Sequence, residues 1–196
     1  MAKKDIILSG VGGQGILSIA TVIGWAALDQ NLHLKQAEVH GMSQRGGDVQ
    51  SNLRISTERI WSDLIPKGEC DLILSLEPME ALRYLPWLSK GGWIVTNSTP
   101  FVNIPNYPPV EEITAELQKI GNVITLDCDE IAKQTGSPRS ANMVLLGASA
   151  AVLEILDPEK LREGITNVFS RKGGKIVEMN IVAFNAGLDV SKNFSK

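Results

Sequence analysis

Residues 5–27, with the sequence DIILSGVGGQGILSIATVIGWAA, decide the fold. Residues 5–9 form a short, mainly apolar run that is typical of a buried strand, and from Ile16 onward apolar residues recur at helical spacing. The four glycines at positions 10, 12, 13 and 15 lie between these two patterns and predict a tight turn. The chain therefore begins with a strand, a glycine turn and a helix.

The glycine turn allows two interpretations. The segment Gly10–Gly15 fits the pattern G-x-G-x-x-G, in which glycines let a ligand approach the backbone and the following helix N-terminus favours a phosphate group. A dinucleotide site also needs an acidic residue about 20 positions further on, and Glu38 stands near that position. Alternatively, the glycines only allow the helix to pack closely against the strand.

The rest of the chain continues the alternation of strands and helices. Strand-like runs occupy residues 34–39, 49–56, 71–76, 93–97 and 122–126. Helices are predicted after Pro78 and over residues 110–120, 129–134, 141–156, 158–169 and 175–188. Gly91 and Gly92 predict a turn just before the strand at 93–97. Because the 49–56 strand is expected to pair antiparallel, the predicted fold is a three-layer α/β/α sandwich with a mostly parallel, mixed sheet. Its first strand, loop and helix are Rossmann-like, its C-terminal part is helical, and residues 1–196 form one domain.

Composition and charge exclude several classes of protein. The 19 basic and 22 acidic residues give a net charge of −3, with no basic stripe of the kind that binds nucleic acid. No apolar stretch is long enough to span a membrane, and no signal peptide is evident, so we expect a cytoplasmic protein. Cys70 and Cys128 are the only cysteines, too few for an iron–sulfur cluster held by four thiolates. We therefore expect no metal site in this chain.

Four segments together carry a family resemblance. They are GVGGQG at 10–15, EVHGMSQRGG at 38–47, LEPMEA at 76–81 and RSANMVLLGA at 139–148. Their order and spacing resemble those of the gamma-type subunit of thiamine-diphosphate-dependent 2-oxoacid:ferredoxin oxidoreductases. Within that family, the 38–47 segment is most similar to the beta subunit of the indolepyruvate type. The resemblance extends from about Ile6 to Gly187.

The resemblance implies a subunit that does not act alone. The family reaction is oxidative decarboxylation of a 2-oxoacid, here indolepyruvate or another aryl pyruvate, to an acyl-coenzyme A, with two electrons passed to ferredoxin. Thiamine diphosphate, magnesium and the iron–sulfur clusters are expected in a large partner subunit, and coenzyme A is the co-substrate. The chain alone is expected to bind none of these cofactors, to form a hetero-oligomer, and to meet ferredoxin only through the complex.

The candidate site residues lie in two of these segments. Arg45 can hold a carboxylate or phosphate with two hydrogen bonds, and His40 can hydrogen-bond a substrate or a partner residue. Glu38 can orient either of these two side chains. Structural roles, an ion pair for Arg45 and a hydrogen bond for His40, remain the alternative. The candidate phosphate-facing or coenzyme-A-facing loop consists of Gly10, Gly12, Gly13, Gln14 and Gly15, although Gln14 is expected to bond the loop backbone.

Two other functions remain open from the sequence. One is a stand-alone oxidoreductase that binds NAD(P) or flavin at Gly10–Gly15, and the other is a purely structural or regulatory subunit. Structural roles are also predicted for Asn142 and for Gly147 in helix packing, and the four tryptophans are expected in the core or at interfaces. Residues 171–175 are expected to form a solvated loop, with a phosphate cradle as the alternative.

Overall fold

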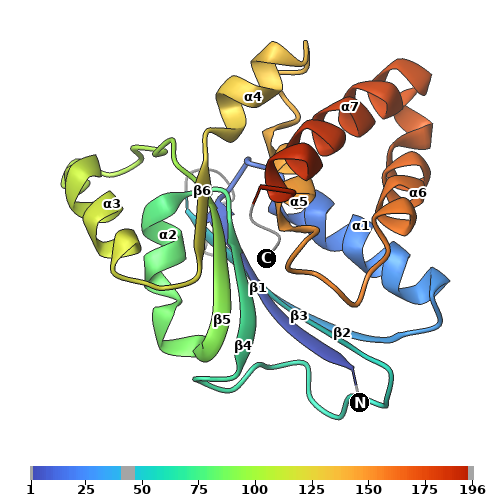
Figure 1. Ribbon diagram of the computed structural model, residues 1–196, viewed down its shortest axis with the longest axis horizontal. Helices are drawn as coiled ribbons and strands as arrows, with labels where there is room; N and C mark the ends of the chain where they lie inside the picture. The colour runs from blue at the N-terminus through green and yellow to red at the C-terminus, as the bar shows by residue number, and fades with distance from the viewer. Residues whose placement is uncertain (1, 41–46, 194–196) are drawn as a thin grey trace.

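The computed structural model describes residues 2–40 and 47–193, and these form a mixed sheet flanked by helices (Figure 1). The strands are β1 (Lys3–Val11), β2 (His33–His40), β3 (Asp48–Ser56), β4 (Cys70–Ser75), β5 (Leu88–Asn97) and β6 (Val123–Leu126). The helices are α1 (Ile16–Asp29), α2 (Pro78–Arg83), α3 (Val110–Gln118), α4 (Cys128–Gln134), α5 (Ala141–Ser149), α6 (Pro158–Phe169) and α7 (Gly174–Ser191), with short 3₁₀ turns η1 (Leu85–Trp87) and η2 (Ser170–Lys172).

The strand order in the sheet is β2-β3-β1-β4-β5-β6. Strands β1, β4, β5 and β6 run parallel, whereas β3 is antiparallel to both of its neighbours. This arrangement confirms the predicted mixed sheet and the antiparallel pairing of the 49–56 strand. It also separates β2 from β1 by one strand, which matters for the position of Glu38.

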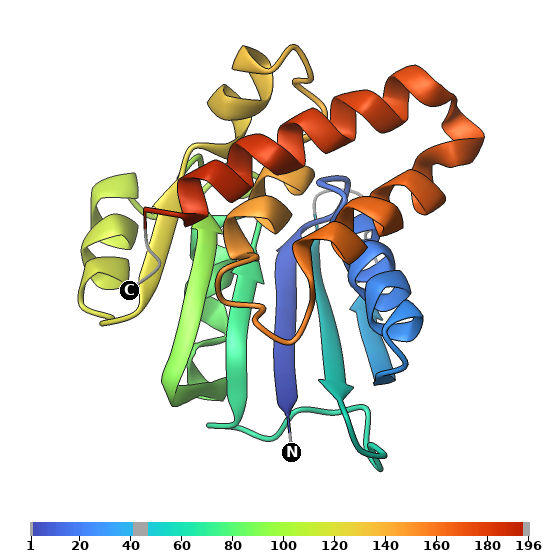
Figure 2. The same ribbon diagram turned by 45° about the vertical axis from the view of Figure 1, so that its right-hand side comes forward.

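Helices cover both faces of the sheet, so the three-layer sandwich is confirmed (Figure 2). Because side chains alternate along β1, Ile6 and Leu8 join the core under α1 and α5–α7, while Ile7 joins a smaller core under α2 and α3. All three side chains are fully buried. The thicker layer contains the predicted helical C-terminal part, and it forms one side of the site described below.

Helices α5 and α7 cross with their backbones almost in contact. A Cβ atom on Gly147 would lie 2.0 Å from the Phe184 carbonyl oxygen, and one on Gly187 would lie 1.9 Å from the Val144 carbonyl oxygen. Each helix therefore contributes a glycine at the point where the other passes. The packing role predicted for Gly147 is confirmed.

Two predicted boundaries are wrong. The helix expected over 141–156 ends at Ser149, and Val152, Leu153 and Leu156 are buried from a turn, so the apolar pattern continues where the helix does not. The turn expected at Gly91 and Gly92 lies inside β5, whose pairing with β4 changes register between Cys70 and Leu72. A Cβ on Gly92 would lie 2.7 Å from the Cys70 carbonyl oxygen, so this glycine allows close approach of the strands.

In the ranges that the structure describes, every helix is too short or too polar to cross a bilayer.

Candidate functional site

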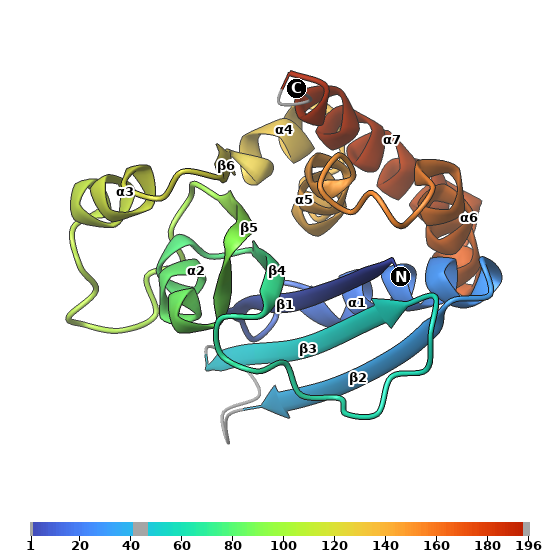
Figure 3. The ribbon, with the colours of Figure 1, turned by 60° about the horizontal axis from the view of Figure 1, so that its bottom comes forward.

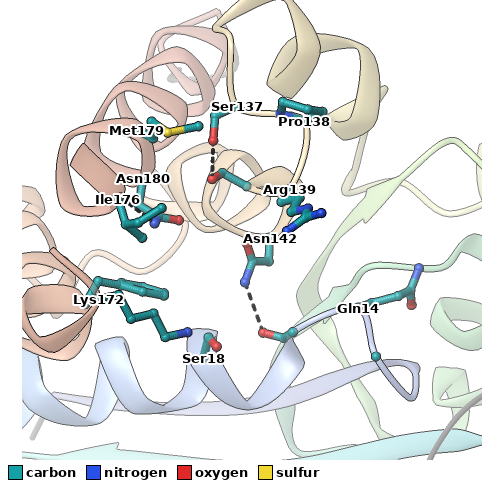
Figure 4. Close-up of a pocket in the computed structure, with 14 residues that line it drawn as sticks. Gln14, Ser18, Ser137, Pro138, Arg139, Asn142, Lys172, Ile176, Met179 and Asn180 are labelled. Carbon is teal, nitrogen blue, oxygen red and sulfur yellow. Dashed lines mark hydrogen bonds between the residues drawn. The ribbon is translucent and has the colours of Figure 1, made fainter. Parts of the chain in front are cut away.

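The glycine loop is fixed by the side chain of Gln14. Its Oε1 accepts a hydrogen bond from the Val11 backbone N–H at 2.7 Å, and its Nε2 donates to the Leu76 carbonyl oxygen at 3.0 Å. The amide therefore ties the loop to the residue that follows β4. This is the backbone role predicted for Gln14, and Figure 4 shows the side chain turned away from the cleft described below.

The glycines of the loop have different roles. A Cβ on Gly10 would lie 2.9 Å from the Gln14 Oε1, and one on Gly15 would lie 2.6 Å from the Asn142 Nδ2, so a side chain at either position would displace an amide that holds the loop. Gly15 also has a φ of +89°, which favours glycine. Gly13 has a φ of +106°, and no described atom lies within 4 Å of the position that a Cβ would take there. Its conformation requires glycine, but its surface is open.

A cleft of about 590 Å³ lies between this loop, the turn before α5 and the start of α7 (Figure 4). Three segments that are far apart in the sequence meet there. The lining residues are Gly13, Gln14, Gly15, Ser18, Ser137, Pro138, Arg139, Ser140, Asn142, Phe169, Lys172, Ile176, Met179 and Asn180. The cleft thus includes three of the five residues of the predicted ligand loop.

The lining of the cleft is suited to an anion with an attached apolar group. Of the described residues that line it, Arg139 and Lys172 are charged, and both are exposed. The N-terminus of α1 also faces the loop and has no acidic residue in its first turn, so its partial positive charge is not neutralised locally. Phe169, Ile176 and Met179 supply an apolar wall opposite the loop.

Hydrogen bonds hold the walls of the cleft in position. The Asn142 Nδ2 donates to the Gly15 carbonyl oxygen at 3.2 Å and so joins α5 to the glycine loop (Figure 4). The hydroxyl groups of Ser137 and Ser140, both buried, share a hydrogen bond of 2.5 Å. The structural role predicted for Asn142 is confirmed, since its side chain reaches the neighbouring loop.

Among the candidate residues outside the glycine loop, Glu38 does not line this cleft. Glu38 is exposed on β2, and its Oε1 accepts a hydrogen bond from the Gln36 Nε2 at 2.5 Å. His40 ends β2 at the edge of the sheet where the glycine loop lies, and Arg45 falls outside the described residues. The catalytic roles proposed for Glu38, His40 and Arg45 stay predictions.

The position of β2 also bears on the dinucleotide interpretation. In a Rossmann unit the acidic residue ends the strand next to β1. Here β3 lies between β1 and β2, so Glu38 stands two strands away, about 10 Å across the sheet. The geometric basis for the dinucleotide interpretation of Glu38 is therefore missing.

Sequence reasoning does not single out most of the cleft residues. Lys172 belongs to a stretch predicted to be a solvated loop, yet the structure places it along the cleft. Arg139 belongs to one of the family segments but has no predicted role of its own. Met179 and Asn180 carry no signal in the sequence, because only the crossing of α7 over α5 brings them to the glycine loop.

The two thiols are poor ligands for a cluster or a metal. Burial raises the pKa of Cys70 to about 12 and raises the pKa of Cys128 well above its ordinary value, so both stay protonated at neutral pH. They also belong to different cores on opposite faces of the sheet. Among the described residues, no group of three or more His, Cys, Asp and Glu is placed to hold a metal ion.

Comparison with known proteins identifies relatives along the whole chain. Residues 5–190 match the family model described as pyruvate ferredoxin/flavodoxin oxidoreductase. The chain is 36% identical to the indolepyruvate oxidoreductase subunit IorB of Pyrococcus horikoshii, over 98% of each chain. It is 37% identical to the subunit of the same name from Methanothermobacter thermautotrophicus, over 93% of this chain and 95% of the relative. Identity to a 2-oxoglutarate synthase subunit KorC, from Methanocaldococcus jannaschii, is lower, at 29%.

Solved structures have the same fold. The gamma subunit of a keto/oxoacid ferredoxin oxidoreductase from Geobacter sulfurreducens has a TM-score of 0.69 and 27% identity, with 97% of this chain and 99% of that chain covered. The 2-oxoglutarate:ferredoxin oxidoreductase of Magnetococcus marinus, with 2-oxoglutarate, coenzyme A and succinyl-CoA bound, has a TM-score of 0.77 and 22% identity. The alignment covers 98% of this chain and 32% of that chain, so the fold is one part of a longer polypeptide there.

Proposed function

Because the chain belongs to the pyruvate ferredoxin/flavodoxin oxidoreductase family, we propose that it is the small subunit of an indolepyruvate:ferredoxin oxidoreductase. One observation carries the choice of substrate. Relatives named as indolepyruvate oxidoreductase subunits match at 35–37% over nearly their whole length, whereas those named for 2-oxoglutarate match at 28–29%. The substrate is then an aryl pyruvate, which loses CO₂ as its acyl group is transferred to coenzyme A and two electrons pass to ferredoxin.

In this proposal the reactive cofactors belong to a large partner subunit. Thiamine diphosphate with magnesium supplies the carbon chemistry there, and iron–sulfur clusters carry the electrons. The protonated, buried thiols of this chain do not suit a cluster, which supports that division of roles. The chain itself shapes and closes part of the shared active site.

The cleft beside the glycine loop is proposed to hold the phosphate-bearing end of coenzyme A. Arg139, Lys172 and the N-terminus of α1 attract the phosphates, and the apolar wall at Phe169 and Met179 accepts the adenine ring. Gly13 offers an open backbone surface for close approach. In support, the structure from Magnetococcus marinus, which has this fold, was solved with coenzyme A bound.

Reconstitution tests the proposed function. The chain is mixed with the separately purified large subunit, and indolepyruvate-dependent, coenzyme-A-dependent reduction of a viologen dye is measured, with pyruvate and 2-oxoglutarate as competing substrates. We expect activity only when both subunits are present, and the highest kcat/KM for indolepyruvate. Full activity of the large subunit alone, or a preference for another 2-oxoacid, would contradict the proposal.

A second experiment tests the cleft. In the assembled enzyme, Arg139→Ala and Lys172→Ala should each raise the KM for coenzyme A by about tenfold, as expected for loss of one charge-assisted contact, with little change in the KM for indolepyruvate. The matched control is Lys175→Ala, which removes an exposed charge near the start of α7 that does not line the cleft. Equal KM values for all three variants and the wild type would place coenzyme A elsewhere.

A further inference from the structure

The connection between β3 and β4, residues 57–69, is held rigidly against the sheet although it has no regular structure. The Arg54 guanidinium donates to both carboxylate oxygens of Asp5, at 2.8 and 3.0 Å, and Asp5 is fully buried. The same guanidinium donates from Nη1 to the carbonyl oxygens of Ser62 and Leu64, at 3.1 and 3.0 Å. A buried ion pair therefore fixes the connection at two points.

This rigid connection presents a tryptophan to solvent. Trp61 is 79% exposed, and the Arg59 guanidinium lies over its ring, 4.1 Å from the ring centroid. Tryptophan and arginine are the side chains most often responsible for binding energy at protein interfaces. Trp61 lies beyond the start of β1 and β2, at the opposite end of the sheet from the coenzyme A cleft, so the proposed catalytic role does not explain it.

A basic hollow of about 300 Å³ separates Trp61 from the free edge of the sheet. We call it the edge hollow, and it is lined by His33, Leu34, Lys35, Arg59, Ile60 and Trp61. Three of the six residues are basic and none is acidic. In the part of the chain that the structure describes, no carboxylate forms an ion pair with Lys35 or Arg59.

The edge hollow adjoins unpaired backbone. Among the strands that the structure describes, β2 is the last on its side of the sheet and pairs with β3 alone (Figure 3). Alternate residues of such an edge strand direct their N–H and C=O groups outward, where they can pair with an added strand. A single extended segment could then make three contacts at once. Its main chain would pair with β2, a carboxylate of the segment would enter the edge hollow, and one of its apolar side chains would pack on Trp61.

From this combination we propose that the edge hollow and β2 form a docking site for an extended, carboxylate-bearing segment of the large partner subunit. The identity of the partner rests on the proposed function, whereas the chemistry of the segment rests on the charges of the site. Pairing of β2 with β2 of a second copy would not bring a carboxylate to the edge hollow from that strand. On β2, the side chains on the face where the edge hollow opens belong to His33, Lys35, Ala37 and Val39, and none is a carboxylate.

The test uses the full-length chain and the purified large subunit. The dissociation constant is measured by calorimetry for wild type, for Lys35→Glu combined with Arg59→Glu, and for Trp61→Ala. The matched controls are Lys90→Glu, an exposed lysine away from the site, and Leu28→Ala, a residue that is 61% exposed on α1. Hydrogen exchange of residues 33–40 and 57–64 is compared between the free chain and the complex, and solution mass gives the oligomeric state of the free chain.

We expect the charge-reversal variant to bind at least tenfold more weakly, with the wild-type affinity falling as salt rises, and Trp61→Ala to bind several-fold more weakly. Both controls should bind like wild type, and β2 should gain protection in the complex. An active complex with unchanged affinities and an unprotected β2 would overturn the docking site and leave the proposed function intact. Assembly through this surface without 2-oxoacid oxidation would overturn the proposed function alone. Dimerisation of the free chain that protects β2 would assign the site to a second copy, and no assembly at all would overturn both proposals.

Discussion

The crossing of α5 and α7 predicts a large effect from a single methyl group. In Gly187→Ala the new Cβ would lie 1.9 Å from the Val144 carbonyl oxygen, 2.8 Å from its carbon and 2.9 Å from the Ala148 nitrogen. Backbone atoms cannot rotate away as a side-chain end can. To reach an ordinary carbon–oxygen contact, the helices must separate by about 1.5 Å, at the closest point of a well-packed core.

The expected magnitude follows from two opposing effects. Replacing glycine by alanine inside a helix normally stabilises a protein by about 1 kcal/mol, because it restricts the unfolded chain. Overpacking of a core costs about 1–3 kcal/mol and more where backbone must move. We therefore expect Gly187→Ala to lower the free energy of unfolding by about 2 kcal/mol, which corresponds to a fall in Tm of about 4–8 °C for a domain of this size.

Urea and thermal unfolding, followed by circular dichroism, measure this effect. Gly174→Ala is the matched control, because it places the same methyl group in the same helix with no described atom within 4 Å. It should leave the stability unchanged or slightly higher. Gly147→Ala should resemble Gly187→Ala, and the double variant should cost less than the sum, because the helices need to separate only once. A Gly187→Ala protein as stable as the Gly174→Ala control would refute the inferred contact.

Three further predictions concern other parts of the chain. Replacing Asn142 with Ala removes its hydrogen bond to the Gly15 carbonyl oxygen, and should lower the free energy of unfolding by about 1 kcal/mol and raise the KM for coenzyme A in the assembled enzyme. Glu77 is fully buried and accepts hydrogen bonds from the Phe101 N–H, at 3.3 Å, and from the Tyr107 hydroxyl. Glu77→Gln should therefore lower the free energy of unfolding by about 1–3 kcal/mol and speed proteolysis within residues 98–109. The control is Glu111→Gln, at an exposed position. Finally, burial raises the pKa of the Cys70 thiol to about 12, so the folded chain keeps a proton that the unfolded chain loses above pH 9. The free energy of unfolding should therefore fall from pH 9 upward, by at most about 1.4 kcal/mol per pH unit for each such thiol. A free energy of unfolding in urea that stays constant above pH 9, or a pH profile that is unchanged in Cys70→Ala, would contradict this.

Local patterns in the sequence are sufficient to predict most of the fold. The first strand, glycine turn and helix follow from residues 5–27, and the period-two pattern of residues 49–56 predicts an antiparallel strand. The exceptions have physical causes. Apolar residues after Ser149 fill the core from a turn, and glycines inside β5 admit a neighbouring backbone, so in each case the local pattern has more than one structural solution.

The candidate site can be predicted only in part. The glycine loop lies at the cleft, but the charged groups opposite it, Arg139 and Lys172, come from segments more than 100 residues away in the chain. Such groups are brought together by the crossing of helices, which no local pattern reports. The order β2-β3-β1 is also invisible in the sequence, and it is this order that separates Glu38 from the glycine loop.

The way in which the cleft is assembled has a consequence for how the chain responds to ligand. Its walls come from the first, third and last quarters of the polypeptide, so a molecule held there acts as a reversible cross-link between the two ends of the chain. Only the native state brings all three walls together, and binding would therefore raise the melting temperature with the logarithm of ligand concentration. Occupancy of the cleft could in this way be followed by calorimetry on the free subunit, before any catalytic partner is added.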